Sequence, residues 1–254
     1  MRVEILGCSG GELPRHRTTC FLVDGRLAID AGALTQSLSL DRLLAIEDVV
    51  LTHGHLDHVK DVPLLADLLV GRARRPLRVH ASPVTARTLR ESVFNDALWP
   101  DFTRIPDTRR PILEIRTFRP DRPFQVGPYA IRPVPVSHTV ESVGLVVSEG
   151  RTAFAVSGDT GPTTRFWERV NAERRLRALL VELSYPNALQ AVADVSGHLT
   201  PRTLAGELEK LDRDGLPVLL YHLKPAHSAA VRRELAALAL PHVRVLRRGE
   251  TLTL

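Results

Sequence analysis

Apolar and polar residues alternate at the start of the chain with the two-residue period that is typical of β-strands. Residues 2–6, 20–24 and 26–30 follow this period, and Asp24-Gly25 between the last two is a dipeptide favoured in two-residue hairpin turns. The pattern predicts that the chain opens with an antiparallel β-meander.

Helical and strand-like segments alternate after this meander. We expect a helix at 37–47, a buried strand at 48–52, and helices at 60–73 and 83–98. Residues 99–128 are rich in Pro, Arg and Asp, so they are expected to be irregular apart from one strand at 112–118.

The second half of the chain repeats the same order of elements. Strands are expected within 129–138, 142–151 and 152–160, with a hairpin turn at Glu149-Gly150. The elements expected after them are helices at 163–174, 200–213 and 229–238, strands at 178–183 and 217–221, and closing strands. Two such halves predict two mixed β-sheets that pack on each other, with helices on the outside, in an α/β fold. Because no linker or repeat interrupts the pattern, we expect a single domain over residues 1–254.

Composition supports a large core and no membrane segment. The chain has 254 residues, 44% of them hydrophobic, which is enough to bury a sizeable core. No apolar run approaches the roughly 18 residues of a membrane span, and residues 1–11 lack the pattern of a signal peptide. We therefore expect a cytoplasmic protein. Cys8 and Cys20 form no disulfide framework and are given no role.

The charge is basic but dispersed. A formal net charge of +5 is compatible with an anionic substrate, yet the arginines are scattered and do not form a stripe. Aromatic residues make up only 5% of the chain, and no Lys/Arg-Gly-aromatic segment is present to stack bases, which favours a small substrate over a polynucleotide.

Three histidines and an aspartate follow the predicted buried strand at 48–52. They are His53, His55, Asp57 and His58, arranged as H-x-H-x-D-H on a strand-to-helix loop. Imidazole and carboxylate groups are the usual ligands of zinc and similar ions, and this spacing lets several of them converge. Without a metal, so many polar groups at the end of a buried strand would lose solvation without compensation. The cluster therefore predicts a metal site.

Further ligand types stand at the ends of later apolar runs. His138 follows the strand-like segment "IRPVPVS", Asp159 follows "TAFAVSG", and His222 follows "PVLLY". Their shared position at the end of a buried strand predicts that they complete a site with two metal ions. His16, His80, His227 and His242 lie in other contexts and are left out of the site.

With these positions in view, the sequence resembles the metallo-β-lactamase superfamily over nearly its whole length. The resemblance implies an αβ/βα sandwich of two mixed β-sheets flanked by helices, with a binuclear metal site along one edge. It implies one metal ion on His53, His55 and His138, another on Asp57, His58 and His222, and Asp159 as the bridge between them. Asp30 would support the ligand loop from behind.

Several shorter strings narrow the resemblance to class II cyclic-nucleotide phosphodiesterases. They are residues 6–23, the loop at 53–65, "FNDALWPDFT" at 94–103, "GHLTP" at 197–201 and "YHLKP" at 221–225. The resemblance implies hydrolysis of 3′,5′-cyclic AMP or cyclic GMP to the 5′-nucleotide by a water molecule that two metal ions activate. "VELSYPNA" at 181–188 and "VSHTVES" at 136–142 match only loosely, and 104–125 do not align.

Three residues outside the metal set are candidates for catalysis or substrate binding, and Asp57 is expected to be catalytic as well as a ligand. His198 is predicted to be a general acid for the departing 3′ oxygen or a contact to the phosphate. It precedes a helix with Thr200 as N-cap, a region that attracts anions. Glu182 is predicted to orient His198, and Lys224 either contacts the phosphate or caps a turn.

Rival functions share much of this site. An RNA or DNA phosphodiesterase of the tRNA 3′-processing type would use the same ligands, and a di-iron redox protein is the alternative from another class. We expect two divalent metal ions, zinc first and manganese or iron as alternatives. The expected partner is a small anionic phosphodiester, with no membrane; a homodimer is compatible with the sequence.

Overall fold

Two seven-stranded β-sheets form the centre of the molecule, and the computed structural model describes all residues from 1 to 254. The first sheet contains, in spatial order, β14 (Thr251–Thr253), β1 (Arg2–Gly7), β2 (Cys20–Val23), β3 (Leu27–Ile29), β4 (Asp48–Val50), β5 (Leu77–Ala81) and β6 (Leu113–Thr117). The second contains β13 (Val243–Val245), β12 (Val218–Tyr221), β11 (Leu176–Glu182), β10 (Thr152–Val156), β9 (Val143–Glu149), β8 (Tyr129–Pro135) and β7 (Phe124–Val126).

Short helices connect the strands. They are α1 (Leu40–Leu44), α2 (Leu56–Val59), α3 (Asp61–Leu69), α4 (Pro83–Thr88), the π-helical turn η1 (Leu89–Val93), α5 (Arg165–Ala172), η2 (Asn187–Leu189), α6 (Gln190–Ser196), α7 (Pro201–Leu208), η3 (Pro225–His227) and α8 (Ser228–Leu238). The longest, α8, has 11 residues, and no helix has the length and apolarity needed to span a bilayer.

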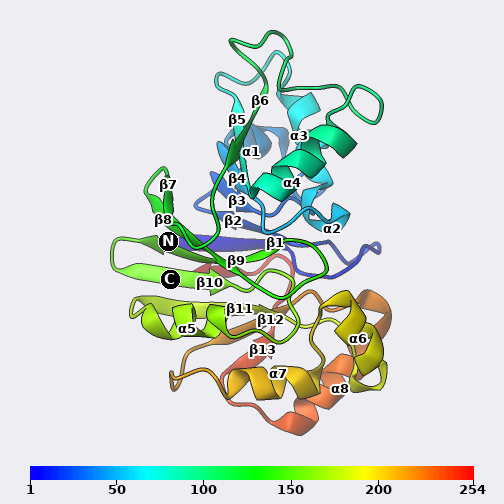
Figure 1. Ribbon diagram of the computed structural model, residues 1–254, viewed down its shortest axis with the longest axis vertical. Coiled ribbons are helices and arrows are strands. Elements are labelled where there is room, and N and C mark those ends of the chain that lie inside the picture. The colour runs from blue at the N-terminus through cyan, green and yellow to red at the C-terminus, as the bar shows by residue number, and fades with distance from the viewer.

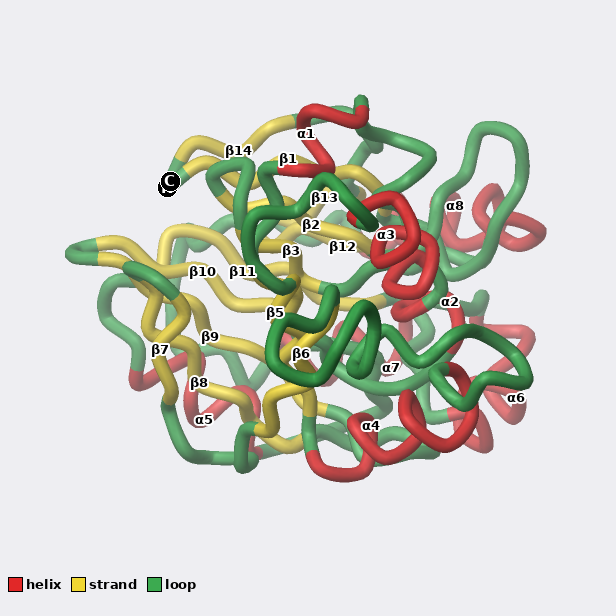
Figure 2. The backbone as a smooth tube through the Cα atoms, turned by 90° about the horizontal axis from the view of Figure 1, so that it is seen from above, coloured by secondary structure: helices red, strands yellow, loops and turns green.

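The molecule has four layers, which Figures 1 and 2 show from two sides, and three apolar cores lie between them. The middle core lies between the two sheets and contains Phe21 from β2 and Phe154 from β10, both fully buried. The outer face of the first sheet packs on α1, α3 and α4, and that of the second sheet packs on α5, α7 and α8. This order of helix, sheet, sheet and helix confirms the predicted αβ/βα sandwich.

The two predicted meanders are present, and each turn lies at the predicted position. β2 pairs antiparallel with β3, with Val23 opposite Leu27, so the loop contains Asp24, Gly25 and Arg26 and is one residue longer than predicted. Asp24 and Gly25 have the positive φ values, 47° and 72°, that this dipeptide favours in a hairpin turn. β9 pairs antiparallel with β10 through Gly150, which has a φ of 53°. In both sheets parallel strands follow the meander, β4 to β6 in the first and β11 to β13 in the second.

Several predicted helices are shorter than expected, and hydrogen bonds account for two of these differences. The helix predicted at 37–47 covers only Leu40–Leu44, because the backbone amides of Glu47 and Asp48 already donate to the carbonyl of Arg26 in the neighbouring hairpin. The helix predicted at 83–98 ends at Val93, because the side chain of Asn95 accepts the amides of Ala97 and Leu98 and turns the chain.

Five elements were not predicted: α2, η2, η3, β7 and α6. β7 lies within the segment 99–128 and pairs with β8 through a turn at Gly127-Pro128. α6 lies between the predicted strand at 178–183 and the predicted helix at 200–213, and it ends at Gly197, whose left-handed φ of 65° is typical of a residue that terminates a helix. Gly127 follows β7 and Gly197 follows α6, so a glycine in the sequence marks the end of each element.

The predicted ligands all follow strands that end at one edge of the sandwich. β4 leads into the histidine loop and α2, while β8, β10 and β12 end shortly before His138, Asp159 and His222. In Figure 1, α2 and α6 mark this edge on the right, and both chain termini lie on the left. Carboxyl ends of parallel strands are a common place for ligand sites.

Candidate metal centre

Asp30 holds the histidine loop in place from behind. Its carboxylate accepts hydrogen bonds from the backbone amide of Thr52 at 2.8 Å and from the Thr52 hydroxyl at 2.9 Å. Its other contact is His58, whose Nδ1 lies 2.7 Å from Oδ2. Asp30 is fully buried and has a φ of 55°, a conformation that is costly for any residue other than glycine. The supporting position implied for Asp30 by the resemblance is the one the structure shows.

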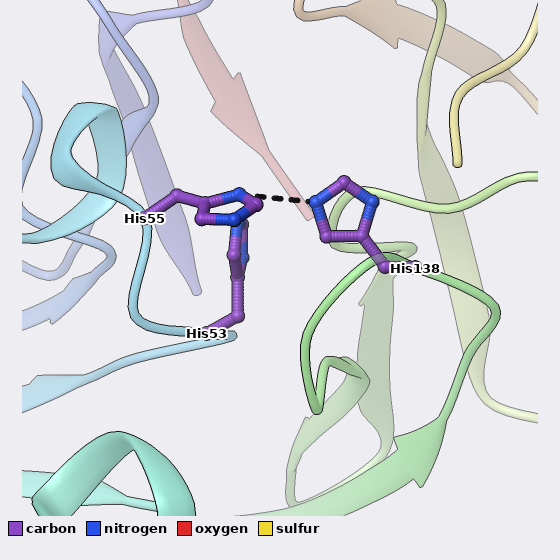
Figure 3. A group of neighbouring side chains, drawn as sticks. All are labelled: His53, His55 and His138. Atoms are coloured by element: carbon purple, nitrogen blue, oxygen red, sulfur yellow. Dashed lines mark hydrogen bonds between the residues drawn. The ribbon is translucent and has the colours of Figure 1, made fainter. Parts of the chain in front are cut away.

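Three histidines form the first group of potential ligands, drawn in Figure 3. His53 and His55 come from the loop after β4, and His138 reaches them from the loop after β8. One ring nitrogen of each lies within 4.8 Å of the others. His55 Nδ1 and His138 Nε2 are 3.1 Å apart, while the second nitrogens of His53 and His138 are held by Thr52 Oγ1 at 3.0 Å and the Gly197 carbonyl at 2.9 Å. The free nitrogens therefore converge on one point.

The second group consists of Asp57, His58, Asp159 and His222, again within 4.8 Å. Asp159 stands between the groups: its Oδ2 lies 3.3 Å from His58 Nε2, 3.1 Å from His222 Nε2 and 3.8 Å from His53 Nε2. This carboxylate thus faces histidines of both sets, as a bridging ligand must. The role itself stays a prediction.

Tight backbone turns bring Asp159 and His222 to this point. Gly158 before Asp159 has a φ of 64°, and a Cβ there would lie 2.5 Å from the carbonyl of Val143. His222 itself has a φ of 70°, and its amide donates to the carbonyl of Cys8. Gly10 packs so closely on the ring of His222 that a Cβ would lie 2.7 Å from Nδ1. The opening "GCSGG" segment therefore forms part of the wall of the site.

The donor set fits divalent metal ions. His53 Nε2, His58 Nε2 and Asp159 Oδ1 are fully buried and have no hydrogen-bond partner, although they lie in the centre of the cluster. Leaving a buried polar group unpaired costs about 1–3 kcal/mol, more if it is charged. Nitrogen and carboxylate ligands in two groups with a shared carboxylate would satisfy all three atoms by coordination, and this chemistry suits zinc, manganese or iron.

The electrostatics of the cluster favour a cation. Burial lowers the pKa of His53 well below its usual range and so keeps the ring neutral, the form that coordinates metal. Burial alone would raise the pKa of Asp159, but the neighbouring His222 and His58 bring it well below its usual range. Burial would lower the pKa of His58, yet Asp159 and Asp30 together raise it well above normal. A proton on His58 therefore balances the negative charge of these buried carboxylates, and a bound metal ion would do the same.

His198 lies beside both groups and is held by Glu182. Its Nδ1 lies 3.0 Å from Glu182 Oε1, and its ring stacks on His222 at 5.2 Å and faces His138 at 5.0 Å. Burial lowers the pKa of His198, but Glu182 outweighs this effect and the net shift is upward. The contact that an orienting role for Glu182 requires is therefore present. Thr200 caps α7 in a capping box, with Pro201 in its first turn, as expected.

Lys224 and the excluded histidines lie outside the cluster. Lys224 directly precedes η3, and its side chain makes no capping hydrogen bond and no ion pair. Its positive charge lowers the pKa of His198. His227 is closer than its sequence context suggests, since its ring is 6.0 Å from that of Tyr185, which is 5.8 Å from His198. His80 is buried on Asp48 at 2.7 Å, and His16 lies 3.3 Å from Ser9 Oγ.

Three residues with close contacts to ligands were not found from the sequence. Thr52 and Ser184 present hydroxyls to His53 and His222, and the Gly197 carbonyl accepts from His138. Gly197 had a signal, since glycine is the residue that most often ends a helix with a positive φ. The two hydroxyls had none, because Ser and Thr are frequent at strand ends.

Removal of divalent ions is expected to destabilise the protein, because the buried carboxylates would lose their compensating charge. Ligand linkage predicts that the free energy of unfolding rises by about 2.7 kcal/mol when an ion is added back at 100 times its dissociation constant. Thermal unfolding after chelation, and again after adding Zn²⁺, measures the effect. A midpoint that does not move with metal would contradict the assignment of these residues as ligands.

Comparison with known proteins agrees with the fold. Residues 21–222 match the family model described as the β-lactamase superfamily domain, so the chain belongs to this superfamily. Its relatives within the superfamily include cyclic-nucleotide phosphodiesterases. A probable 3′,5′-cyclic-nucleotide phosphodiesterase from Yersinia pestis is 30% identical over 72% of this chain and 58% of its own length.

Two further comparisons involve yeast. The 3′,5′-cyclic-nucleotide phosphodiesterase 1 of Saccharomyces cerevisiae is 25% identical over 80% of this chain and 68% of its own length. The crystal structure of unliganded yeast PDE1 superposes with a TM-score of 0.83 at 24% identity, covering 100% of this chain and 99% of that one. The structural likeness shows the fold, and the chain spans little more than half of the Yersinia pestis relative.

Proposed function

We propose that the protein is a metal-dependent phosphodiesterase that hydrolyses 3′,5′-cyclic AMP or cyclic GMP to the 5′-nucleotide. The observation that carries the proposal is the position of Asp159 between two groups of ligands, in a chain whose relatives are cyclic-nucleotide phosphodiesterases. A shared carboxylate would hold two ions close together, which is the arrangement that phosphodiester hydrolysis uses.

The chain would hold one ion with His53, His55 and His138 and the other with Asp57, His58 and His222. Two bound divalent ions supply positive charge for the phosphate oxygens and lower the pKa of water at the site. The Asp57 side chain is 28% exposed, whereas the Asp159 side chain is 2% exposed, so substrate would approach from the side of Asp57.

His198 is the proposed source of the proton for the departing 3′ oxygen. Its Nδ1 is engaged by Glu182 at 3.0 Å, which leaves Nε2 to face the cluster. Glu182 accepts three further hydrogen bonds, from the amides of Leu199 and Thr160 and from the Ser184 hydroxyl, so its position is fixed. A protonated His198 beside this carboxylate is a general acid that is held in one orientation. Lys224 adds a positive charge nearby.

Zinc is the ion that the proposal places first. The ligands are imidazoles and carboxylates, and no thiolate takes part: Cys20 is buried in the outer core of the first sheet, and Cys8 Sγ lies 3.8 Å from the carbonyl of Leu246. Manganese and iron use the same ligand types, so metal analysis of the purified protein decides between them.

The substrate is tested by direct competition between small and large phosphodiesters. Purified, metal-assayed protein is incubated with cyclic AMP, cyclic GMP and a short RNA with a 3′ extension, and products are separated by chromatography. We expect 5′-AMP or 5′-GMP at a kcat of about 1 s⁻¹ or more. If the RNA is cleaved and both cyclic nucleotides remain intact, the substrate assignment is wrong and the protein is an RNA phosphodiesterase.

A further inference from the structure

Ser184 joins two histidines that the mechanism treats separately. It follows β11, is fully buried, and its amide donates to the carbonyl of Leu199 at 3.1 Å. Its hydroxyl oxygen lies 2.9 Å from His222 Nδ1, 3.2 Å from His198 Nδ1 and 3.0 Å from Glu182 Oε2. A single hydroxyl thus contacts a predicted metal ligand, the predicted acid and the carboxylate that orients this acid.

The number of protons on these groups determines which atom donates and which accepts in each hydrogen bond. His222 Nε2 faces the carboxylates of Asp57 at 3.2 Å and Asp159 at 3.1 Å, so Nε2 is the nitrogen available to a metal ion. When Nε2 coordinates, the proton of the neutral ring must be on Nδ1, where Ser184 Oγ is the acceptor. The hydroxyl has one proton of its own, and the carboxylate of Glu182 accepts it.

The same arrangement occurs on the other side of the site. His53 Nδ1 lies 3.0 Å from Thr52 Oγ1, and this hydroxyl donates to Asp30 Oδ2 at 2.9 Å. In each case a histidine of the metal cluster donates to a hydroxyl, which donates to a buried carboxylate. His58 reaches Asp30 directly at 2.7 Å. Two hydroxyl relays with the same polarity, one in each half of the fold, are hard to attribute to helix or strand packing.

We propose that Ser184 is a positioning residue that fixes the tautomer of His222 and ties its ring to the His198–Glu182 pair. Glu182 makes no direct hydrogen bond to His222, so Ser184 provides the hydrogen-bonded connection between this carboxylate and a ligand of the second ion. Groups that orient ligands in this way typically contribute 10- to 100-fold, roughly, to metal affinity. The proposal rests on the metal site of the proposed function and not on its substrate.

The test is the metal affinity of Ser184→Ala, measured by Zn²⁺ titration against a competing chelator. We expect one of two sites to weaken by about 10- to 100-fold and the other to keep its affinity. Ser148→Ala is the matched control, because it removes a buried hydroxyl in β9 that donates to the carbonyl of Ala130 in β8, away from the cluster. This control should bind both ions as the wild type does.

A second readout separates positioning from a general loss of structure. In the zinc-loaded wild type, the Nδ1 proton of His222 should give a hydrogen-bonded ¹H–¹⁵N signal, which should shift or vanish in Ser184→Ala and persist in Ser148→Ala. Unchanged affinity and an unchanged signal in Ser184→Ala would overturn the proposal. Since neither readout uses a cyclic nucleotide, failure of the proposed substrate would leave a positive result standing.

Discussion

Asp159→Ala is expected to abolish measurable hydrolysis and to reduce the metal content of the protein. Its carboxylate is buried and faces His53, His58 and His222, so its removal takes charge from both groups of ligands. Metal ions contribute several kcal/mol to charge stabilisation in the transition state, and each 1.36 kcal/mol corresponds to a factor of about ten in rate. We therefore expect kcat/KM to fall by at least about 10³-fold.

Two further variants serve as comparisons for Asp159→Ala. Asp57→Ala should reduce occupancy of one ion, because Asp57 belongs to one group and is partly exposed. Asp194→Ala removes an acid that contacts only Gln190 on α6, and it should retain metal and activity. Elemental analysis after dialysis measures the ions. Full occupancy by two ions in Asp159→Ala would rule out a bridging role for this residue.

His198→Ala is expected to lower kcat by about 10²- to 10⁴-fold, the usual contribution of a general acid, while both metal ions stay bound. The reason is geometric: His198 Nδ1 is taken by Glu182, and its ring lies against His138 and His222 without being needed to complete either ligand group. Steady-state kinetics combined with elemental analysis separates loss of chemistry from loss of metal.

His242→Ala is the matched control for this histidine. His242 is exposed in the turn before β13, and its backbone carbonyl, which accepts from the amide of Val218, is unchanged by the substitution. It should keep wild-type kcat. If His198→Ala retained wild-type kcat, or bound fewer ions, His198 would not be the general acid, and the second outcome would place it among the metal ligands.

The features predicted correctly depend on short-range pattern. Hydrophobic alternation and Asp24-Gly25 define the first hairpin locally, and the histidine loop follows an apolar run that forms β4. The distant ligands were predictable for a different reason. Strands such as β10 and β12 end at the same edge of their sheet, so Asp159 and His222 at their ends meet there.

The features that were missed depend on contacts that no local pattern encodes. Ser184 is one of many serines near strand ends, and its importance arises only because β11 brings it beside His222 and His198. The end of α1 is set by hydrogen bonds from Glu47 and Asp48 to Arg26, which lies in another segment. β7 and α6 are short, and their pairing or packing partners decide their structure more than their own propensities do.

The most direct test of the account is a titration of metal-free protein with Zn²⁺ while cyclic AMP hydrolysis and bound metal are followed together. The two ligand groups predict that 5′-AMP formation rises with occupancy and reaches its maximum at two ions per chain. Full activity without bound metal, or a maximum at one ion with the second group empty, would contradict a binuclear phosphodiesterase.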